Sequence, residues 1–123
     1  MKILIADDSP DTLKIYTFVL MRAGHEVVGA RDGNEAWESF RTAADAREPF
    51  ELLMLDVAMP GMDGLECAAK IRCFEKEQSM TPTRLIFLSA HLGQMAVADV
   101  ERLGIESIEQ KPIGLDELRA LCK

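Results

Sequence analysis

Hydrophobic and polar positions along the chain alternate between short apolar runs and longer stretches with helical periodicity. Leu52–Leu55, which reads Leu-Leu-Met-Leu without a polar residue, is typical of a strand buried on both faces. The apolar runs predict five β-strands, at Lys2–Ala6, Glu26–Ala30, Leu52–Leu55, Arg84–Ser89 and Ser107–Gln110. The amphipathic stretches that follow them predict helices at Pro10–Ala23, after Asp32, and at Gly64–Glu77, Gln94–Leu103 and Leu115–Lys123.

Residues at the expected helix ends support these boundaries. Ser9 is a suitable N-cap for the first helix, Pro10 fits its first turn, and Gly24 is suited to end it. Asp32 is a suitable cap for the second helix, and Glu35 stands three residues later at the spacing of a capping box.

The strict order of strand and helix predicts an α/β fold. Such alternation requires right-handed crossovers, which produce a parallel sheet with helices on both of its faces. A chain of 123 residues, 48% of them hydrophobic, suits one domain with one real core, so we expect residues 1–123 to form a single domain.

Composition and charge narrow the classes of function. A net charge of −7 without a basic run argues against non-specific binding to nucleic acid or to anionic membranes. No apolar run approaches membrane-spanning length. Three cysteines, an odd number in helix-like surroundings, favour reduced thiols and a cytoplasmic location. The charged run at 75–77 is expected to be a solvated helix end.

Polar residues follow four of the five predicted strands. Asp7 and Asp8 come after the first strand, Asp56 after the third, Ser89 at the end of the fourth and Lys111 after the fifth. Each of them alone would be interpreted as a turn former, a helix cap or a solvated charge. In an open parallel sheet, however, ligands bind outside the carboxyl ends of the strands, so these groups are expected to converge at one edge.

Elementary chemistry limits what such a cluster can do. Three close carboxylates repel one another and require a counter-charge, and a set of oxygen ligands favours Mg2+. A carboxylate can also attack phosphorus and form an aspartyl phosphate. The metal, the Lys111 ammonium and the Ser89 hydroxyl are suitable partners for the charged oxygens of a transferred phosphoryl group.

Four sequence blocks resemble the CheY-like receiver domain of two-component response regulators. They are Asp7-Asp8, the stretch Leu55-Asp56-Val57-Ala58-Met59-Pro60-Gly61-Met62-Asp63-Gly64, Ser89-Ala90 and Lys111-Pro112. The resemblance covers essentially the whole chain, with the blocks in the family's order. It implies a flavodoxin-like doubly wound sheet of five parallel strands in the order 2-1-3-4-5.

The resemblance also implies roles for the strand-end residues. Asp56 would accept a phosphoryl group from a histidine kinase or a histidine phosphotransfer protein. Asp7, Asp8, Asp56 and the backbone carbonyl of Ala58 would bind Mg2+. Lys111 would contact the phosphoryl group.

Signal output follows from the same resemblance. Ser89 would move to hydrogen-bond the phosphoryl group and so alter a partner-binding face formed by the fourth helix, fifth strand and fifth helix. Ile108 stands where the family usually has the Tyr or Phe of its switch. Ala58 and His91 occupy positions that tune the lifetime of the phosphoryl group in this family, and the Lys111–Pro112 bond is expected to be cis. The protein would be a monomer or a phosphorylation-dependent dimer.

Other classes of function remain as alternatives. A magnesium-dependent phosphohydrolase with an aspartyl nucleophile usually has a second acidic residue two positions later, where this chain has Ala58. A flavin or nucleotide binder would need a hydroxyl- or glycine-rich loop after the first strand, where Asp7 and Asp8 would repel phosphate. A degenerate receiver that acts only as a docking module is compatible with Ile108. The sequence favours a phosphoacceptor switch that has no separate enzymatic substrate.

Overall fold

The computed structural model describes residues 1–90 and 97–123. Predicted element boundaries agree with it to within two residues, except that the expected helix start at Gln94 lies outside the described residues. The strands are β1 (Lys2–Ala6), β2 (Glu26–Ala30), β3 (Leu52–Asp56), β4 (Arg84–Ser89) and β5 (Ser107–Gln110). The helices are α1 (Pro10–Arg22), α2 (Gly33–Asp45), α3 (Gly64–Glu77), α4 (Val97–Leu103) and α5 (Leu115–Leu121).

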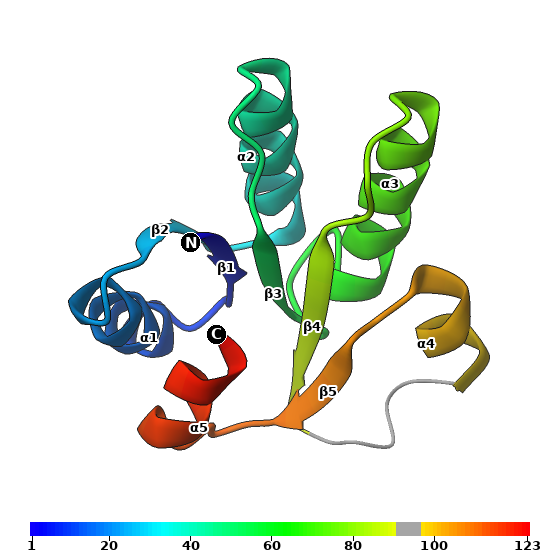
Figure 1. Ribbon diagram of the computed structural model, residues 1–123. Coiled ribbons are helices and arrows are strands. Elements are labelled where there is room, and N and C mark those ends of the chain that lie inside the picture. The colour runs from blue at the N-terminus through cyan, green and yellow to red at the C-terminus, as the bar shows by residue number, and fades with distance from the viewer. Residues whose placement is uncertain (91–96) are drawn as a thin grey trace.

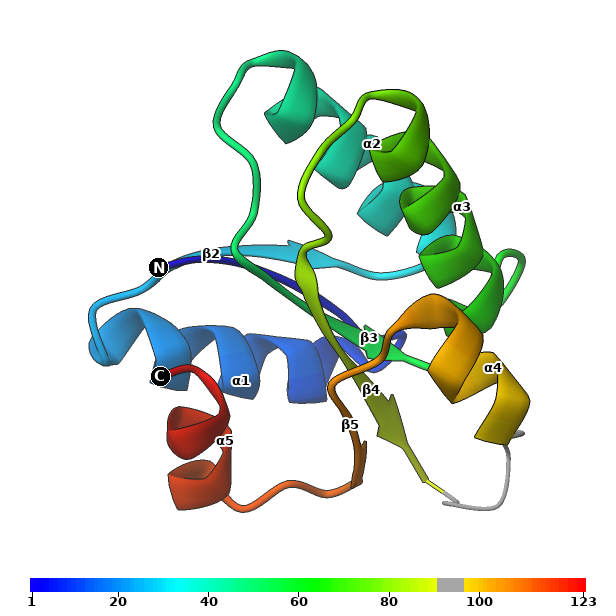
Figure 2. The same ribbon diagram turned by 45° about the vertical axis from the view of Figure 1, so that its right-hand side comes forward.

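The five strands form one parallel sheet in the order β2-β1-β3-β4-β5, as the sequence resemblance implied. Helices α1 and α5 cover one face of this sheet, and α2, α3 and α4 cover the other (Figures 1 and 2). The predicted α/β fold with helices on both faces is therefore confirmed. Because all strands run in the same direction, their carboxyl ends lie along one edge.

Alternation of side chains along the strands divides the core into two layers. In β1, Ile3 and Ile5 belong to the cluster under α1 and α5, whereas Leu4 and Ala6 belong to the cluster under α2, α3 and α4. Strand β3 is buried along its whole length, as its unbroken apolar run predicted. Burial on both faces holds this strand, and the residue at its carboxyl end, in a fixed position.

Two predicted helix caps are present. The Ser9 hydroxyl accepts a hydrogen bond from the Thr12 N–H at 3.4 Å, and Asp32 accepts one from the Glu35 N–H at 2.8 Å. Among the described residues, no helix combines the length and the apolar character that crossing a membrane would require.

The carboxyl-terminal end of α3 differs from the sequence prediction. Glu75 was expected to be solvated, but it is 2% exposed and its carboxylate pairs with the Arg72 guanidinium at 2.8 Å. The Thr83 N–H donates to the other Glu75 oxygen at 2.7 Å. Arg72 also donates to the carbonyls of Thr83, Leu103 and Gly104. The prediction was wrong at Glu75 because the segment before β4 and the end of α4 pack onto this end of α3, where they bond to Glu75 and fix its partner Arg72.

Candidate functional site

The candidate site is built on the carboxyl-terminal edge of the sheet. Asp56 is the last residue of β3 rather than the first residue after it, and Asp7 extends β1 through a hydrogen bond from its N–H to the Ala30 carbonyl at 3.0 Å. Asp56 and Asp7 each stand two residues after a side chain of the α1–α5 core, Met54 and Ile5 respectively. The two-residue period of a strand therefore directs both carboxylates to the same side of the sheet.

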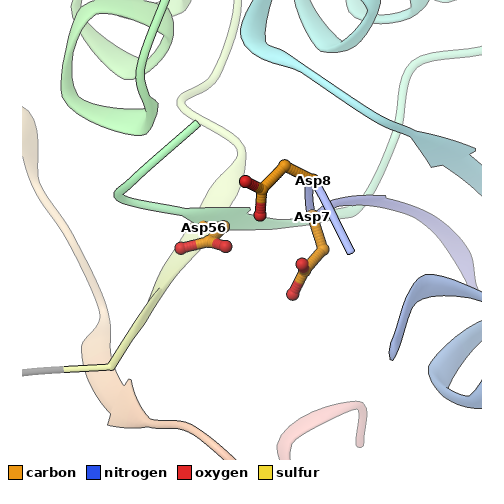
Figure 3. Close-up of side chains that lie close together, drawn as sticks. All are labelled: Asp7, Asp8 and Asp56. Carbon is orange, nitrogen blue, oxygen red and sulfur yellow. The ribbon is translucent and has the colours of Figure 1, made fainter. Parts of the chain in front are cut away.

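Three carboxylates lie together at this edge. One carboxylate oxygen from each of Asp7, Asp8 and Asp56 lies within 4.8 Å of the other two. Figure 3 shows the three side chains close together at the ends of β1 and β3. Asp7 is completely buried and Asp56 is 3% exposed, whereas Asp8 is exposed to solvent. Two fixed oxygen donors and one solvent-facing donor suit a hard divalent cation that keeps part of its water shell, which is how proteins commonly bind Mg2+.

Lys111 brings a positive charge into the cluster from the other end of the chain. Its ammonium lies 2.7 Å from Asp56 Oδ2 and 3.0 Å from Asp7 Oδ2, and its side chain is 19% exposed. The Lys111 N–H donates to the Ser89 carbonyl at 2.7 Å, and the Lys111–Pro112 peptide bond is cis, as the resemblance implied. One ammonium cannot neutralise three carboxylates, so the cluster has an excess of negative charge that suits a second cation.

Burial and charge shift the acidity of the two central groups. Burial raises the pKa of Asp56 above its usual value; the hydrogen bond and charge of Lys111 oppose this shift, and the charge of Asp7 reinforces it. Burial alone would lower the pKa of Lys111, but its hydrogen bonds with Asp56 and Asp7 and their charges raise the pKa overall. Lys111 is therefore held in its charged form.

The loop between β3 and α3 holds Asp56 from its other side. The Ala58 N–H donates to Asp56 Oδ1 at 3.2 Å, and the Gly64 N–H closes the loop on the Val57 carbonyl at 3.0 Å. A Cβ atom at Gly64 would lie only 2.3 Å from the Asp56 carbonyl oxygen, so only glycine fits there without movement of the backbone. This close approach is a positional requirement that the sequence analysis did not identify at Gly64.

The remaining candidates occupy different environments. Ser89 ends β4, is 1% exposed and pairs with Gln110 of β5 at the same edge as the carboxylates. Ile108 is partly buried and packs against the core cluster under α2, α3 and α4. His91 lies outside the described residues. The structure thus brings Asp7, Asp8, Asp56 and Lys111 into one cluster, with Ser89 on the adjacent strand.

A doubly wound parallel sheet with charged groups at its carboxyl edge defines the class of protein, and comparison with known proteins identifies the family. The family model described as "Response regulator receiver domain" matches residues 3–123. The chain therefore belongs to the receiver-domain family of two-component response regulators, whose domains are signalling modules.

Two curated proteins with similar sequences are also signalling proteins. The chain is 32% identical over 117 residues to the sensor histidine kinase GacS of Pseudomonas protegens, covering 95% of this chain but only 12% of that protein. It is 32% identical over 113 residues to a chemotaxis protein CheY homologue of Campylobacter jejuni, covering 91% of this chain and 82% of the relative. The match thus extends over most of one small relative and a small part of a much larger one.

A solved structure with the same fold is a complex of CheX, CheY, BeF3 and Mg2+ from Borrelia burgdorferi. It superimposes with a TM-score of 0.82 at 28% sequence identity, covering 99% of this chain and 87% of the matched chain.

Proposed function

We propose that this protein is a phosphorylation-controlled signalling switch whose phosphoacceptor is Asp56. The observation that supports this proposal most directly is that the Lys111 ammonium bridges the buried carboxylates of Asp56 and Asp7, while Asp8 faces solvent beside them. The carboxylate is the nucleophile for phosphoryl transfer, and a fixed cation together with an acidic side that can hold a metal accelerates the reaction by neutralising charge.

The chain's own residues divide the chemistry between them. An Asp56 carboxylate oxygen attacks the phosphorus of a phosphohistidine; the new P–O bond forms as the P–N bond breaks, and the electron pair of that bond returns to the imidazole. The Lys111 ammonium, already at hydrogen-bond distance from Asp56, stabilises the charge on the transferred oxygens. The Ser89 hydroxyl is assigned to another of these oxygens.

Asp7, Asp8, Asp56 and the Ala58 carbonyl are the groups that would hold Mg2+. When bound there, the cation supplies the additional positive charge that phosphoryl transfer needs. The oxygen-only character of the cluster supports this choice of metal, and the Borrelia complex that contains Mg2+ and BeF3 is consistent with it.

The phosphodonor would be a histidine kinase or a histidine phosphotransfer protein in the cytoplasm, and the output a protein that contacts the α4–β5–α5 face. Ile108 packs against the core and has no hydroxyl, so the aromatic half of the usual switch is replaced by an aliphatic contact. Coupling from the site to that face is assigned to Ser89, whose carbonyl is bonded to the Lys111 backbone.

Phosphorylation can be measured directly by intact mass. Incubation with Mg2+ and acetyl phosphate is expected to add one phosphoryl group, which is absent in Asp56→Asn and when Mg2+ is chelated. Asp63→Asn is the matched control, because Asp63 is a nearby carboxylate that caps α3 and lies outside the cluster. An unchanged mass in the wild type would refute the proposal, and rapid turnover of many phosphate esters would indicate the hydrolase instead.

A further inference from the structure

A buried tyrosine of α1 contacts the segment that carries Lys111. The Tyr16 hydroxyl accepts a hydrogen bond from the Ile113 N–H at 3.1 Å, across 97 residues of sequence. Tyr16 is 4% exposed and Ile113 is 5% exposed, and both belong to the core layer under α1 and α5. A buried N–H whose partner is removed cannot turn to water, so this hydroxyl constrains the backbone strongly.

The segment 111–113 has only two backbone donors, because Pro112 has no N–H. One of them, the Lys111 N–H, is bonded to the Ser89 carbonyl of β4 at 2.7 Å. The other, the Ile113 N–H, is bonded to Tyr16. The backbone that positions the Lys111 ammonium is therefore fixed to the sheet on one side and to α1 on the other.

Helix α1 is itself joined to the acidic end of the site. The Ser9 N–H donates to Asp7 Oδ1 at 2.9 Å, and Ser9 is the N-cap of the helix that carries Tyr16 two turns later. Lys111 bonds to the other oxygen of Asp7 at 3.0 Å. Lys111 is thus linked to Asp7 in two ways: directly through its ammonium, and indirectly through the bond from Ile113 to Tyr16 and through helix α1.

We propose that the Tyr16 hydroxyl is a positioning group for the Lys111 ammonium, which it holds within hydrogen-bond distance of Asp56 and Asp7. This inference rests on the proposed function, because it assigns Tyr16 an effect on phosphoryl transfer to Asp56. Tyr16 itself does not touch the reacting atoms. Its contribution is to limit the positions available to the ammonium.

Tyr16→Phe tests the proposal by removing one oxygen atom and keeping the ring in the core. The rate of phosphorylation by acetyl phosphate with Mg2+ is expected to fall about tenfold, since small misplacements of a catalytic group are costly. Thr17→Val is the matched control: Thr17 is the next residue of α1, and its hydroxyl oxygen is buried without a hydrogen-bond partner in the part of the chain that the structure describes. Its rate is expected to stay within about twofold of the wild type, as for a change that breaks no hydrogen bond.

A second variant distinguishes positioning from a general loss of structure. In a Lys111→Ala background, Tyr16→Phe is expected to change the rate less than about twofold, because the group that it positions is gone. Rates are compared well below the thermal midpoint of the less stable variant. An undiminished effect of Tyr16→Phe in that background, or no effect in the wild-type background, would overturn the inference. Failure of the proposed function would differ, since the wild type itself would then not be phosphorylated.

Discussion

Replacement of Lys111 by Met tests the electrostatics of the site without requiring a phosphodonor. The substitution keeps an unbranched apolar side chain but removes the ammonium that lies 2.7 Å from Asp56 and 3.0 Å from Asp7. Both carboxylates are almost completely buried, so solvent cannot replace the lost charge. We therefore expect Lys111→Met to destabilise the metal-free protein substantially.

The magnitude follows from the geometry. At these separations each ion pair has a gross Coulomb energy of about 6 kcal/mol for an effective dielectric constant of about 20. The loss of hydration energy on burial of the ammonium offsets most of this attraction. Breaking a buried ion pair by removing one partner typically lowers the free energy of unfolding by about 3–5 kcal/mol. We expect the lower end, about 3 kcal/mol at pH 7, because Lys111 is 19% exposed and a neighbouring water can partly replace it.

Urea unfolding measures the free energy of unfolding of Lys111→Met and of the wild type, each without metal and with Mg2+. At a concentration tenfold above its Kd, Mg2+ is expected to raise the stability of Lys111→Met by about 1.4 kcal/mol over that of the metal-free variant, because it supplies positive charge to the carboxylates. Lys14→Met, which removes an exposed ammonium from α1, is the control and should change stability by less than about 0.5 kcal/mol.

The pH dependence provides an independent check. Lys111 lowers the pKa of Asp56, so its removal raises that pKa further above the value in the unfolded chain. A carboxyl group with a raised pKa favours folding below its unfolded pKa of 3.8 and loses this contribution as pH rises through the folded value. The difference in free energy of unfolding between Lys111→Met and the wild type should therefore become smaller as pH falls from 7 to 4. A loss of stability that is independent of pH, in a variant that Mg2+ does not stabilise, would refute the electrostatic explanation.

Two further substitutions test other parts of the structure. Asp56→Asn should stabilise the metal-free protein at pH 7, because the raised pKa of Asp56 means that its ionisation opposes folding. The gain should diminish as pH falls toward 4 in thermal unfolding, and a loss of stability at pH 7 would contradict this. Glu75→Ala should cost about 3 kcal/mol in urea unfolding, because it removes the carboxylate that neutralises Arg72 and leaves the buried Thr83 N–H without an acceptor. Exposed Glu77→Ala is the control, and an equal loss of stability in both variants would contradict a special role of Glu75.

Local patterns were sufficient to locate the elements and the candidate site. Apolar runs of strand length alternate with amphipathic stretches, and that order admits few folds other than a parallel doubly wound sheet. Once the sheet is parallel, residues at the ends of different strands must share an edge. The convergence of Asp7, Asp8, Asp56 and Lys111 was therefore predictable from residue positions alone.

Side-chain environments that depend on distant segments were not predictable in this way. The residue types at 75–77 suit a solvated helix end, yet Glu75 is buried because Arg72 and the Thr83 N–H meet it there. Tyr16 reads as one more apolar position of an amphipathic helix, yet its hydroxyl is bonded to Ile113, which the sequence places 97 residues away.

The sequence by itself determined the order of the elements, the edge of the sheet where charged groups gather and the kind of cation that they suit. Those properties depend on hydrophobic periodicity and on the chemistry of side chains, which each residue carries with it. Only the tertiary structure decided that Asp7 and Asp56 are buried, that one ammonium bridges them and that α1 holds the segment carrying it. Burial and hydrogen bonding between segments exist only when the chain has folded, because distant parts of the sequence then exclude water together.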